Sequence, residues 1–335
     1  MSIATPDPGA VRSDADADAP LSLTLTDPER REFDAVAQQL ATTTPELIDD
    51  AKWVAAAREL SAHLPPRLRQ VVRAYRHDPG EDGTLLLRNL PVDPEVLPTT
   101  PTVPESVERE ATVPAAVAVL IAAELGEIAA YRNEKSGALV QNVVPVPGRE
   151  SSQSNAGSTP LELHVENAFH PHRPDFVGLL CLRADPDNAA GTLVSSFRRT
   201  LRLLDPATRE VLHQERFTTV PPPSFRSGDS AVAHAVLTGD PEDPNVKVDF
   251  NATAAVDTEA AAALERLRDA FVEASTSVPL RSGEMVFVDN RLAIHGRSAF
   301  TPRYDGQDRW LHRTFVLLDN RRTRGSRPGN GSVLD

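Results

Sequence analysis

Short apolar runs, cut repeatedly by glycine, proline and asparagine, make up the chain from residue 138 onward. Their lengths and compositions are typical of β-strands, and they read ALVQNVVPV, LELHVENAF, FVGLLCL, TLVSSF, VKVDF, EMVFVDN and WLHRTFVLL. Helices do not alternate with these strands as they do in a parallel α/β sheet, so the strands must cover one another's apolar faces. The pattern predicts a mainly β fold, a closed sandwich or jelly roll, with flanking helices packed outside it.

The N-terminal part of the chain has helical patterns instead. An N-cap residue followed by proline occurs at Asp27-Pro28 and at Thr44-Pro45, which predicts a helix after each pair. A further helix is expected across Val113–Leu125. The run from 83 to 90 predicts a strand, and its abrupt end at a proline favours the edge of a sheet.

The domain boundary is expected near residue 25. Residues 1–24 are rich in aspartate, alanine, proline and serine, which predicts a disordered tail. Residues 25–335 are expected to form one domain, helical to about residue 130 and a jelly roll after it.

Charge and cysteine content exclude some classes of partner. The net charge of −13 argues against a nucleic-acid partner, because phosphate binding needs a basic surface. No apolar run has membrane-spanning length, and the N-terminus lacks a signal pattern. The single cysteine, Cys181, can form no internal disulfide, and its apolar neighbours favour a buried thiol. We therefore expect a cytoplasmic protein that does not bind a membrane.

A candidate pair of metal ligands lies in the strand-like run LELHVENAF. Successive side chains of a strand alternate between its two faces, so His164 and Glu166 point the same way and can share one cation. The H-x-E pattern alone is weak, because a second copy occurs at His213-Gln214-Glu215. That copy follows a helix start at Asp205-Pro206, and helical residues two apart diverge by roughly 200°.

A third candidate ligand raises the first pair above chance. His295 follows a strand and a polar turn in EMVFVDNRLAIHGRSAF. Two histidines and one carboxylate form the facial triad of non-haem Fe(II) oxygenases, which leaves iron positions open for a 2-oxo acid and dioxygen. The nearby His170-Pro171-His172 reads as a loop and is a weaker candidate.

Two arginines near the C-terminus predict anion binding. Arg309 and Arg313 lie in DRWLHRTFV, where a strand would place both on one face with Leu311 and Phe315. Guanidinium groups among apolar residues are costly unless each meets an anion. The sequence therefore predicts two bound carboxylates, one on 2-oxoglutarate and one on the substrate.

With these residues the chain resembles the clavaminate synthase-like branch of Fe(II)/2-oxoglutarate oxygenases, which has H-x-E where most relatives have H-x-D. The resemblance runs from about Leu86 to the C-terminus and includes LVQNVVPVPG, NAGSTPLELHVENAFHPHRPDF, VDNRLAIHGRSAFTPRYDGQDRWLHRTFVL and RRTRGSRP. It implies a double-stranded β-helix core of the cupin-like jelly-roll type.

The resemblance also implies roles for individual residues. Iron is held by His164, Glu166 and His295. Arg309 matches the arginine that binds the distal carboxylate of 2-oxoglutarate, and Thr192 matches a hydroxyl that supports this cosubstrate.

Further positions match the substrate site of that branch. Arg313 matches an arginine for the substrate α-carboxylate, and Glu134 a carboxylate for its α-amino group. Asn155 and Asp249 match residues that hold a side-chain amide, and the segment from 221 to 231 matches a lid.

These matches imply hydroxylation at C3 of a free L-amino acid, asparagine first, with Fe(II), 2-oxoglutarate and dioxygen. The product would be a building block for peptide natural products such as antibiotics. Cationic amino acids hydroxylated at C3 or C4 stay open, since Asp249 beside Asn251 suits an amide or a cation equally. Desaturation or ring closure is a further outcome on the same frame. A cupin-like metal-binding protein without turnover is the alternative from another class, and the paired arginines argue against it.

Overall fold

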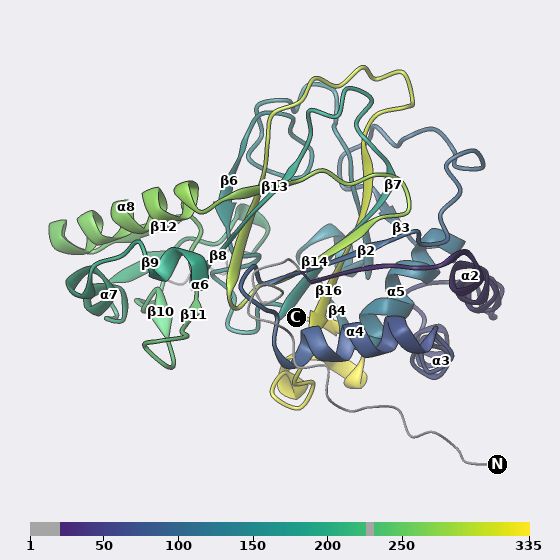
Figure 1. The fold of residues 1–335 in the computed structure, drawn as a ribbon, viewed down its shortest axis with the longest axis horizontal. Coiled ribbons are helices and arrows are strands. Elements are labelled where there is room, and N and C mark those ends of the chain that lie inside the picture. Colours follow the sequence, from purple (N-terminus) through teal and green to yellow (C-terminus); the bar gives the residue numbers. More distant parts are fainter. Residues whose placement is uncertain (1–20, 226–230) are drawn as a thin grey trace, which may run out of the picture.

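The computed structural model describes residues 21–225 and 231–335. Within them a nine-stranded sheet and a four-stranded sheet form the centre of the molecule, with helices outside them (Figure 1). This arrangement confirms the predicted mainly β fold with flanking helices.

The large sheet is mixed. Along its main path the strands are β1 (Leu21–Thr24), β2 (Thr84–Arg88), β14 (Met285–Asp289), β7 (Phe176–Arg183), β16 (Trp310–Leu317), β4 (Glu127–Tyr131) and β17 (Val333–Leu334). β5 (Val140–Val143) pairs with β16 and with β3 (Val107–Glu108). The β1–β2 and β17–β4 pairs are parallel, and the other pairs are antiparallel.

The four-stranded sheet carries two candidate metal ligands. Its order is β13 (Thr276–Val278), β8 (Thr192–Ser196), β15 (Ala293–Arg297) and β6 (Leu161–His164), and all of its pairs are antiparallel. Two small ribbons lie beside it, made of β10 (Leu237–Thr238) with β11 (Asn245–Val246) and of β9 (Phe217–Thr219) with β12 (Thr253–Ala255).

Two groups of helices cover the sheets at opposite ends of the view in Figure 1. One group comprises α2 (Asp27–Ala41), α3 (Ala51–Ser61), α4 (Pro66–His77) and α5 (Val113–Leu125); the other comprises α6 (Phe197–Leu201), α7 (Pro206–Leu212) and α8 (Thr258–Glu273). No helix within the described ranges is both long and apolar enough to cross a membrane.

Helix α5 is the centre of the N-terminal core. It is apolar on all sides and packs between β16 and the helices α2 and α3, so nine of its 13 residues are buried. The Thr112 side chain caps its first turn by accepting from Ala115 N–H. A Cβ on Gly126 would lie 2.7 Å from Leu317 O, so a glycine lets the helix end directly against β16. Burial of each large side chain, such as Leu120, contributes about 1.5–3 kcal/mol.

Two predictions about the N-terminal region were wrong, and one contact explains both. Leu21–Thr24 form β1 and pair in parallel with Leu85–Arg88, so the predicted tail does not extend to residue 24. For the same reason β2 is not an edge strand, because β1 covers one side and β14 the other. Residues 1–20 of the predicted tail lie outside the described residues.

Two of the predicted N-terminal helices were confirmed, and the predicted start of a third was wrong. Asp27–Ala41 and Val113–Leu125 form helices as expected. The second helix begins at Ala51 rather than after Thr44-Pro45, and it is capped by Asp50, whose side chain accepts from Lys52 N–H. Helix α4 was not predicted.

Candidate metal centre and active site

His164, Glu166 and His295 come together where the end of β6 meets the middle of the neighbouring strand β15. His164 is the last residue of β6 and is the direct cross-strand partner of His295 on β15. The His164 and His295 ring centroids are 4.5 Å apart, and His295 Nε2 is 3.7 Å from Glu166 Oε2. One potential ligand atom from each residue lies within 4.8 Å of the other two. This donor set and spacing suit a single Fe(II) ion.

The protonation states of this cluster also suit a metal. Burial lowers the pKa of His295, which favours the neutral imidazole that a metal ligand requires. Burial alone would raise the pKa of Glu166, but Arg313 and His295 hold it below its ordinary value, so this carboxyl is ionised. His164 Nδ1 lies 2.8 Å from the backbone oxygen of Glu162, a contact that directs its other ring nitrogen toward the cluster.

The two weaker histidine candidates lie elsewhere. His213 caps the C-terminus of α7, and His170 accepts a hydrogen bond from His172 N–H through its ring. Burial lowers the pKa of His170 to about 4, and its ring packs edge-on against Tyr131. Across residues 21–225 and 231–335, the group of His164, Glu166 and His295 is the one with metal-ligand spacing.

Arg313, in the middle of β16, is surrounded by acceptors. Its Nη1 donates to Glu166 Oε2 at 2.8 Å, and its Nη2 donates to Glu134 Oε1. Its Nε donates to Gln141 Oε1 at 3.1 Å. In the amide orientation that satisfies both groups, Asn155 Oδ1 accepts from Nη1 at 3.0 Å and from Nη2 at 3.1 Å. One buried guanidinium therefore joins a candidate metal ligand to two predicted substrate residues.

Glu134 is the second carboxylate on this guanidinium. Burial raises its pKa, against the opposing effect of Arg313, and the nearby charge of Glu166 raises it further. It also accepts from Asn167 Nδ2 at 3.1 Å. Glu134 is thus an acceptor that gains by meeting a second cation, such as an ammonium group.

These residues line one cavity of about 570 Å³, a size suited to a small molecule. Its walls include the predicted metal and substrate residues Glu134, Asn155, His164, Glu166, Asp249 and Arg313. A separate cavity of about 600 Å³, lined partly by α2, contains none of them. Of these two cavities, the one beside Glu166 is therefore the candidate active site, because it contains the predicted metal and substrate residues.

Asp249 reaches this cavity by a route that the sequence did not predict. VKVDF was expected to be one strand, but β11 ends at Val246 and Asp249 forms an isolated bridge with His164. Asp249 Oδ1 accepts from Asn251 N–H at 2.8 Å, which makes a local turn. Both residues line the cavity.

The predicted lid also borders the cavity in part. Residues 220–225 line it, whereas residues 226–230 lie outside the described residues. The lid therefore stays a prediction.

Arg309 and Thr192 are not among the residues that line this cavity, and each side chain is buried without a hydrogen-bond partner among the described residues. Arg309 immediately precedes β16 and is 7% exposed; burial lowers its pKa, and no hydrogen bond or ion pair reaches it from the described part of the chain. Thr192 is also buried, and its Oγ1 has no hydrogen-bond partner there. The register of β16 shifts between Trp310 and Leu311, so the predicted alternation is not continuous from Arg309 to Arg313. A buried cation and a buried hydroxyl without partners fit a bound carboxylate.

Two buried residues were not predicted, one paired with Thr192 and one bonded to Arg313. Arg297 is the cross-strand partner of Thr192 and donates to Ser154 O at 3.3 Å and Thr159 O at 3.0 Å, so it holds the loop that carries Asn155. Burial, together with the charge of Arg309, lowers its pKa to about 10. Its position two residues after His295 in a strand was a usable signal. Gln141 in β5 is the other, and a lone amide in an apolar strand was a weaker signal.

Comparison with known proteins agrees with this geometry. The family model described as "Taurine catabolism dioxygenase TauD, TfdA family" matches residues 80–315. L-asparagine oxygenase of Streptomyces coelicolor is 50% identical over 313 residues, which cover 93% of this chain and 94% of that protein. Clavaminate synthase 2 of Streptomyces clavuligerus is 37% identical, covering 84% and 88%. L-lysine 3-hydroxylase of Catenulispora acidiphila is 32% identical, covering 96% and 90%.

Solved structures agree as well. Asparagine oxygenase in complex with Fe(II), 2S,3S-3-hydroxyasparagine and succinate superimposes with a TM-score of 0.91 at 49% identity, covering 93% of this chain and 98% of that one. The expected resemblance to clavaminate synthase-like oxygenases and the expected jelly-roll core are thereby confirmed. The chain belongs to the TauD/TfdA family of dioxygenases.

Proposed function

We propose that this chain hydroxylates a free L-amino acid at C3, with L-asparagine as its substrate, using Fe(II), 2-oxoglutarate and dioxygen. The contact between Arg313 and Glu166, 2.8 Å long within one cavity, carries the proposal. A substrate carboxylate on Arg313 lies beside a metal ligand. The carbons close to that carboxylate, rather than a distant side-chain end, then face the metal.

The donors present fit the metal and cosubstrate. His164, Glu166 and His295 would hold the iron, and Arg309 with Thr192 would bind the distal carboxylate of 2-oxoglutarate. When bound, iron, 2-oxoglutarate and dioxygen supply the oxidation of a C–H bond. The protein then needs no general acid or base, and its residues act by binding and orienting the substrate and by excluding water.

The α-amino and α-carboxylate groups meet opposite charges. Arg313 would bind the carboxylate, and Glu134, which shares this guanidinium, would receive the ammonium group. Ammonium binding favours the ionised form of Glu134, whose pKa is raised by burial. A carrier-bound thioester has no carboxylate for Arg313, which favours free amino acid.

The side-chain end of the substrate would meet Asn155 and Asp249. A primary amide can donate to the Asp249 carboxylate and accept from the Asn155 amide. The 50% identity to an asparagine oxygenase over most of both chains supports asparagine. A cationic substrate is the second candidate, because Asp249 offers a carboxylate and a lysine 3-hydroxylase is also related.

A substrate screen tests the proposal. Succinate release is measured with Fe(II), 2-oxoglutarate and each of asparagine, aspartate, glutamine, arginine, ornithine and lysine, and the product carbon is located by NMR. We expect succinate formation with asparagine to exceed that with every other amino acid at least tenfold, with hydroxylation at C3. Preferential turnover of arginine or lysine would replace asparagine with the second candidate. Absence of turnover, together with no charge-transfer band from anaerobic Fe(II) and 2-oxoglutarate, would favour a metal-binding protein instead.

A further inference from the structure

Asn290 uses both ends of its side-chain amide on the backbone of Glu166. It lies in the turn between β14 and β15 and is 0% exposed. Its Oδ1 accepts from Glu166 N–H at 2.8 Å, and its Nδ2 donates to Glu166 O at 3.0 Å. The same Nδ2 donates to Pro174 O at 2.9 Å. A single amide therefore satisfies both backbone polar groups of a candidate metal ligand.

Glu166 needs such a partner because it lies beyond the end of its strand. β6 ends at His164, and Asn167 already has a left-handed φ of 52°. In the part of the chain that the structure describes, the backbone of Glu166 thus has no partner in a β-ladder, although its side chain is buried. A buried N–H or carbonyl left unpaired is strongly unfavourable, because it loses its hydrogen bonds to water and gains none in the protein. Asn290 takes the place of a neighbouring strand at this one residue.

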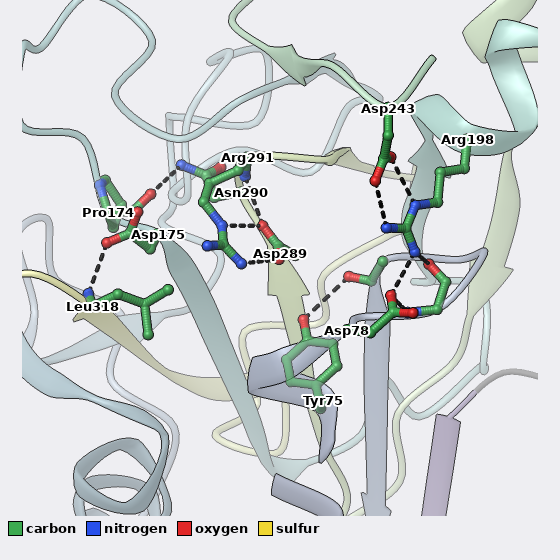
Figure 2. A network of polar contacts seen from close by, with 12 residues as sticks. Tyr75, Asp78, Pro174, Asp175, Arg198, Asp243, Asp289, Asn290, Arg291 and Leu318 are labelled. Atoms are coloured by element: carbon green, nitrogen blue, oxygen red, sulfur yellow. Dashed lines mark hydrogen bonds and ion pairs between the residues drawn. The ribbon is translucent and has the colours of Figure 1, made fainter. Parts of the chain in front are cut away.

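The Asn290 turn is itself held in place from both sides (Figure 2). Asn290 N–H donates to Asp175 O at 2.9 Å, and Asp289 N–H donates to Gly83 O at 2.8 Å. The Asp289 carboxylate accepts from Arg291 Nε at 2.9 Å. These bonds fix the turn against β7 and the segment before β2.

The same turn leads into the strand that carries the third candidate ligand. His295 follows Asn290 by a few residues on β15, so one rigid turn sets the backbone of Glu166 relative to His295. Small displacements of a ligand backbone are felt directly in the ligand-to-ligand spacing, which is why groups that orient metal ligands affect affinity.

We propose that Asn290 is a positioning residue of the iron centre, fixing the Glu166 backbone so that its carboxylate faces His164 and His295. This inference rests on the proposal that Glu166 binds iron. Asparagine suits the place because its short side chain offers one acceptor and two donors. Aspartate would instead turn a carboxylate oxygen toward the carbonyls of Glu166 and Pro174.

The test compares two alanine variants by Fe(II) titration under anaerobic conditions. Asn290→Ala is expected to bind Fe(II) about 10–100-fold more weakly than the wild type, the range for lost ligand-orienting contacts. Asn142→Ala is the matched control. Asn142 is a buried amide that bonds Ser106, Glu108 and Trp310 and contacts no candidate metal ligand. We expect it to lose thermal stability while keeping wild-type Fe(II) affinity within twofold.

The outcomes separate this inference from the metal site itself. A folded Asn290→Ala with wild-type Fe(II) affinity, or an equal loss of affinity in Asn142→Ala, would overturn the role of Asn290. Glu166→Gln is titrated in parallel. If it retains wild-type affinity, the assignment of Glu166 as a ligand fails. If it loses affinity while Asn290→Ala does not, the positioning role alone fails.

A measurement on the wild type keeps the inference testable if Asn290→Ala does not fold. Amide hydrogen exchange of the metal-free protein should show Glu166 N–H protected to a similar extent as Val286 N–H in β14, despite its place outside a strand. If the Glu166 N–H exchanges faster than the Val286 N–H by two or more orders of magnitude, Asn290 does not fix the Glu166 backbone and the inference is overturned.

Discussion

Arg309 and Arg313 lie four residues apart, and their surroundings differ sharply. Arg313 donates to Glu166, Glu134 and Gln141, so protein acceptors neutralise and orient it. Arg309 is as deeply buried, but no ion pair or hydrogen bond reaches it within the described ranges. A guanidinium with protein partners contributes to the fold and to ligand orientation together. A guanidinium without them is a cost to the fold that a bound anion offsets.

The largest expected effect comes from removing the partnered arginine. Arg313→Leu leaves Glu134 and Glu166 buried without their cation, which should lower the free energy of unfolding by about 3–5 kcal/mol and abolish turnover. Urea unfolding and succinate release measure both. Arg216→Leu is the matched control, because Arg216 also bonds two carboxylates, Asp257 and Glu259, but at the surface. It should lose much less stability than Arg313→Leu, because solvent screens an exposed ion pair. Equal losses of stability in Arg313→Leu and Arg216→Leu would show that burial of the Arg313 ion pairs does not increase their contribution.

Replacing Arg309 should weaken the binding of 2-oxoglutarate without lowering the free energy of unfolding. In Arg309→Leu the free energy of unfolding should stay unchanged or rise, since an unpaired buried cation is lost. The KM for 2-oxoglutarate should rise about 100-fold, equivalent to about 2.7 kcal/mol. Steady-state kinetics with both substrates checks this, with the KM for the amino acid as the internal control. If Arg309→Leu unfolds more easily and keeps its KM for 2-oxoglutarate, Arg309 has a structural role like that of Arg313 and does not bind the cosubstrate.

Cosubstrate binding should stabilise the protein through Arg309. With metal bound, 2-oxoglutarate at 100 times its Kd should add about 2.7 kcal/mol to the free energy of unfolding. The same concentration should add little to Arg309→Leu, because its affinity is lower. Thermal unfolding with and without 2-oxoglutarate measures the difference. Equal stabilisation of both proteins would place the distal carboxylate elsewhere.

The smallest expected effect is a pH dependence at Glu134. Its pKa is raised in the folded protein, above the value of about 4.3 for an exposed glutamate. The folded state therefore holds this proton more tightly, and the contribution of Glu134 to stability falls as pH rises from about 4 through the raised pKa. Metal-free wild type should thus lose stability relative to Glu134→Gln between pH 4 and 7, as measured by urea unfolding. If the wild type instead gains stability relative to Glu134→Gln over this pH range, the pKa of Glu134 is lowered rather than raised by folding.

Much of the candidate site follows from local pattern. His164 and Glu166 share a cavity wall, although β6 ends at His164, so the predicted strand does not extend to Glu166. His295 lies on the neighbouring strand β15, inside the apolar run in which the sequence placed it. Asp249 shows the limit of this reasoning. It reaches the cavity through a bridge and a turn rather than a regular strand, so its position depends on contacts with His164 and Asn251.

The N-terminal errors have the same origin. Leu21–Thr24 is too short and its surroundings too polar to predict a strand, and its partner lies more than 60 residues away in β2. Once β1 covers β2, the proline after residue 90 no longer marks a sheet edge. Strand pairing over such distances leaves almost no local signal.

The amino-acid sequence by itself determined the fold class, the family and the identity of the candidate ligands, because strand periodicity and side-chain chemistry are local properties. Tertiary structure alone decided which charges meet. It set Arg313 between Glu134 and Glu166, left Arg309 without a hydrogen-bond or ion-pair partner among residues 21–225 and 231–335, and aimed the Asn290 amide at the Glu166 backbone. These pairings join segments more than 100 residues apart, and burial makes each one energetically decisive.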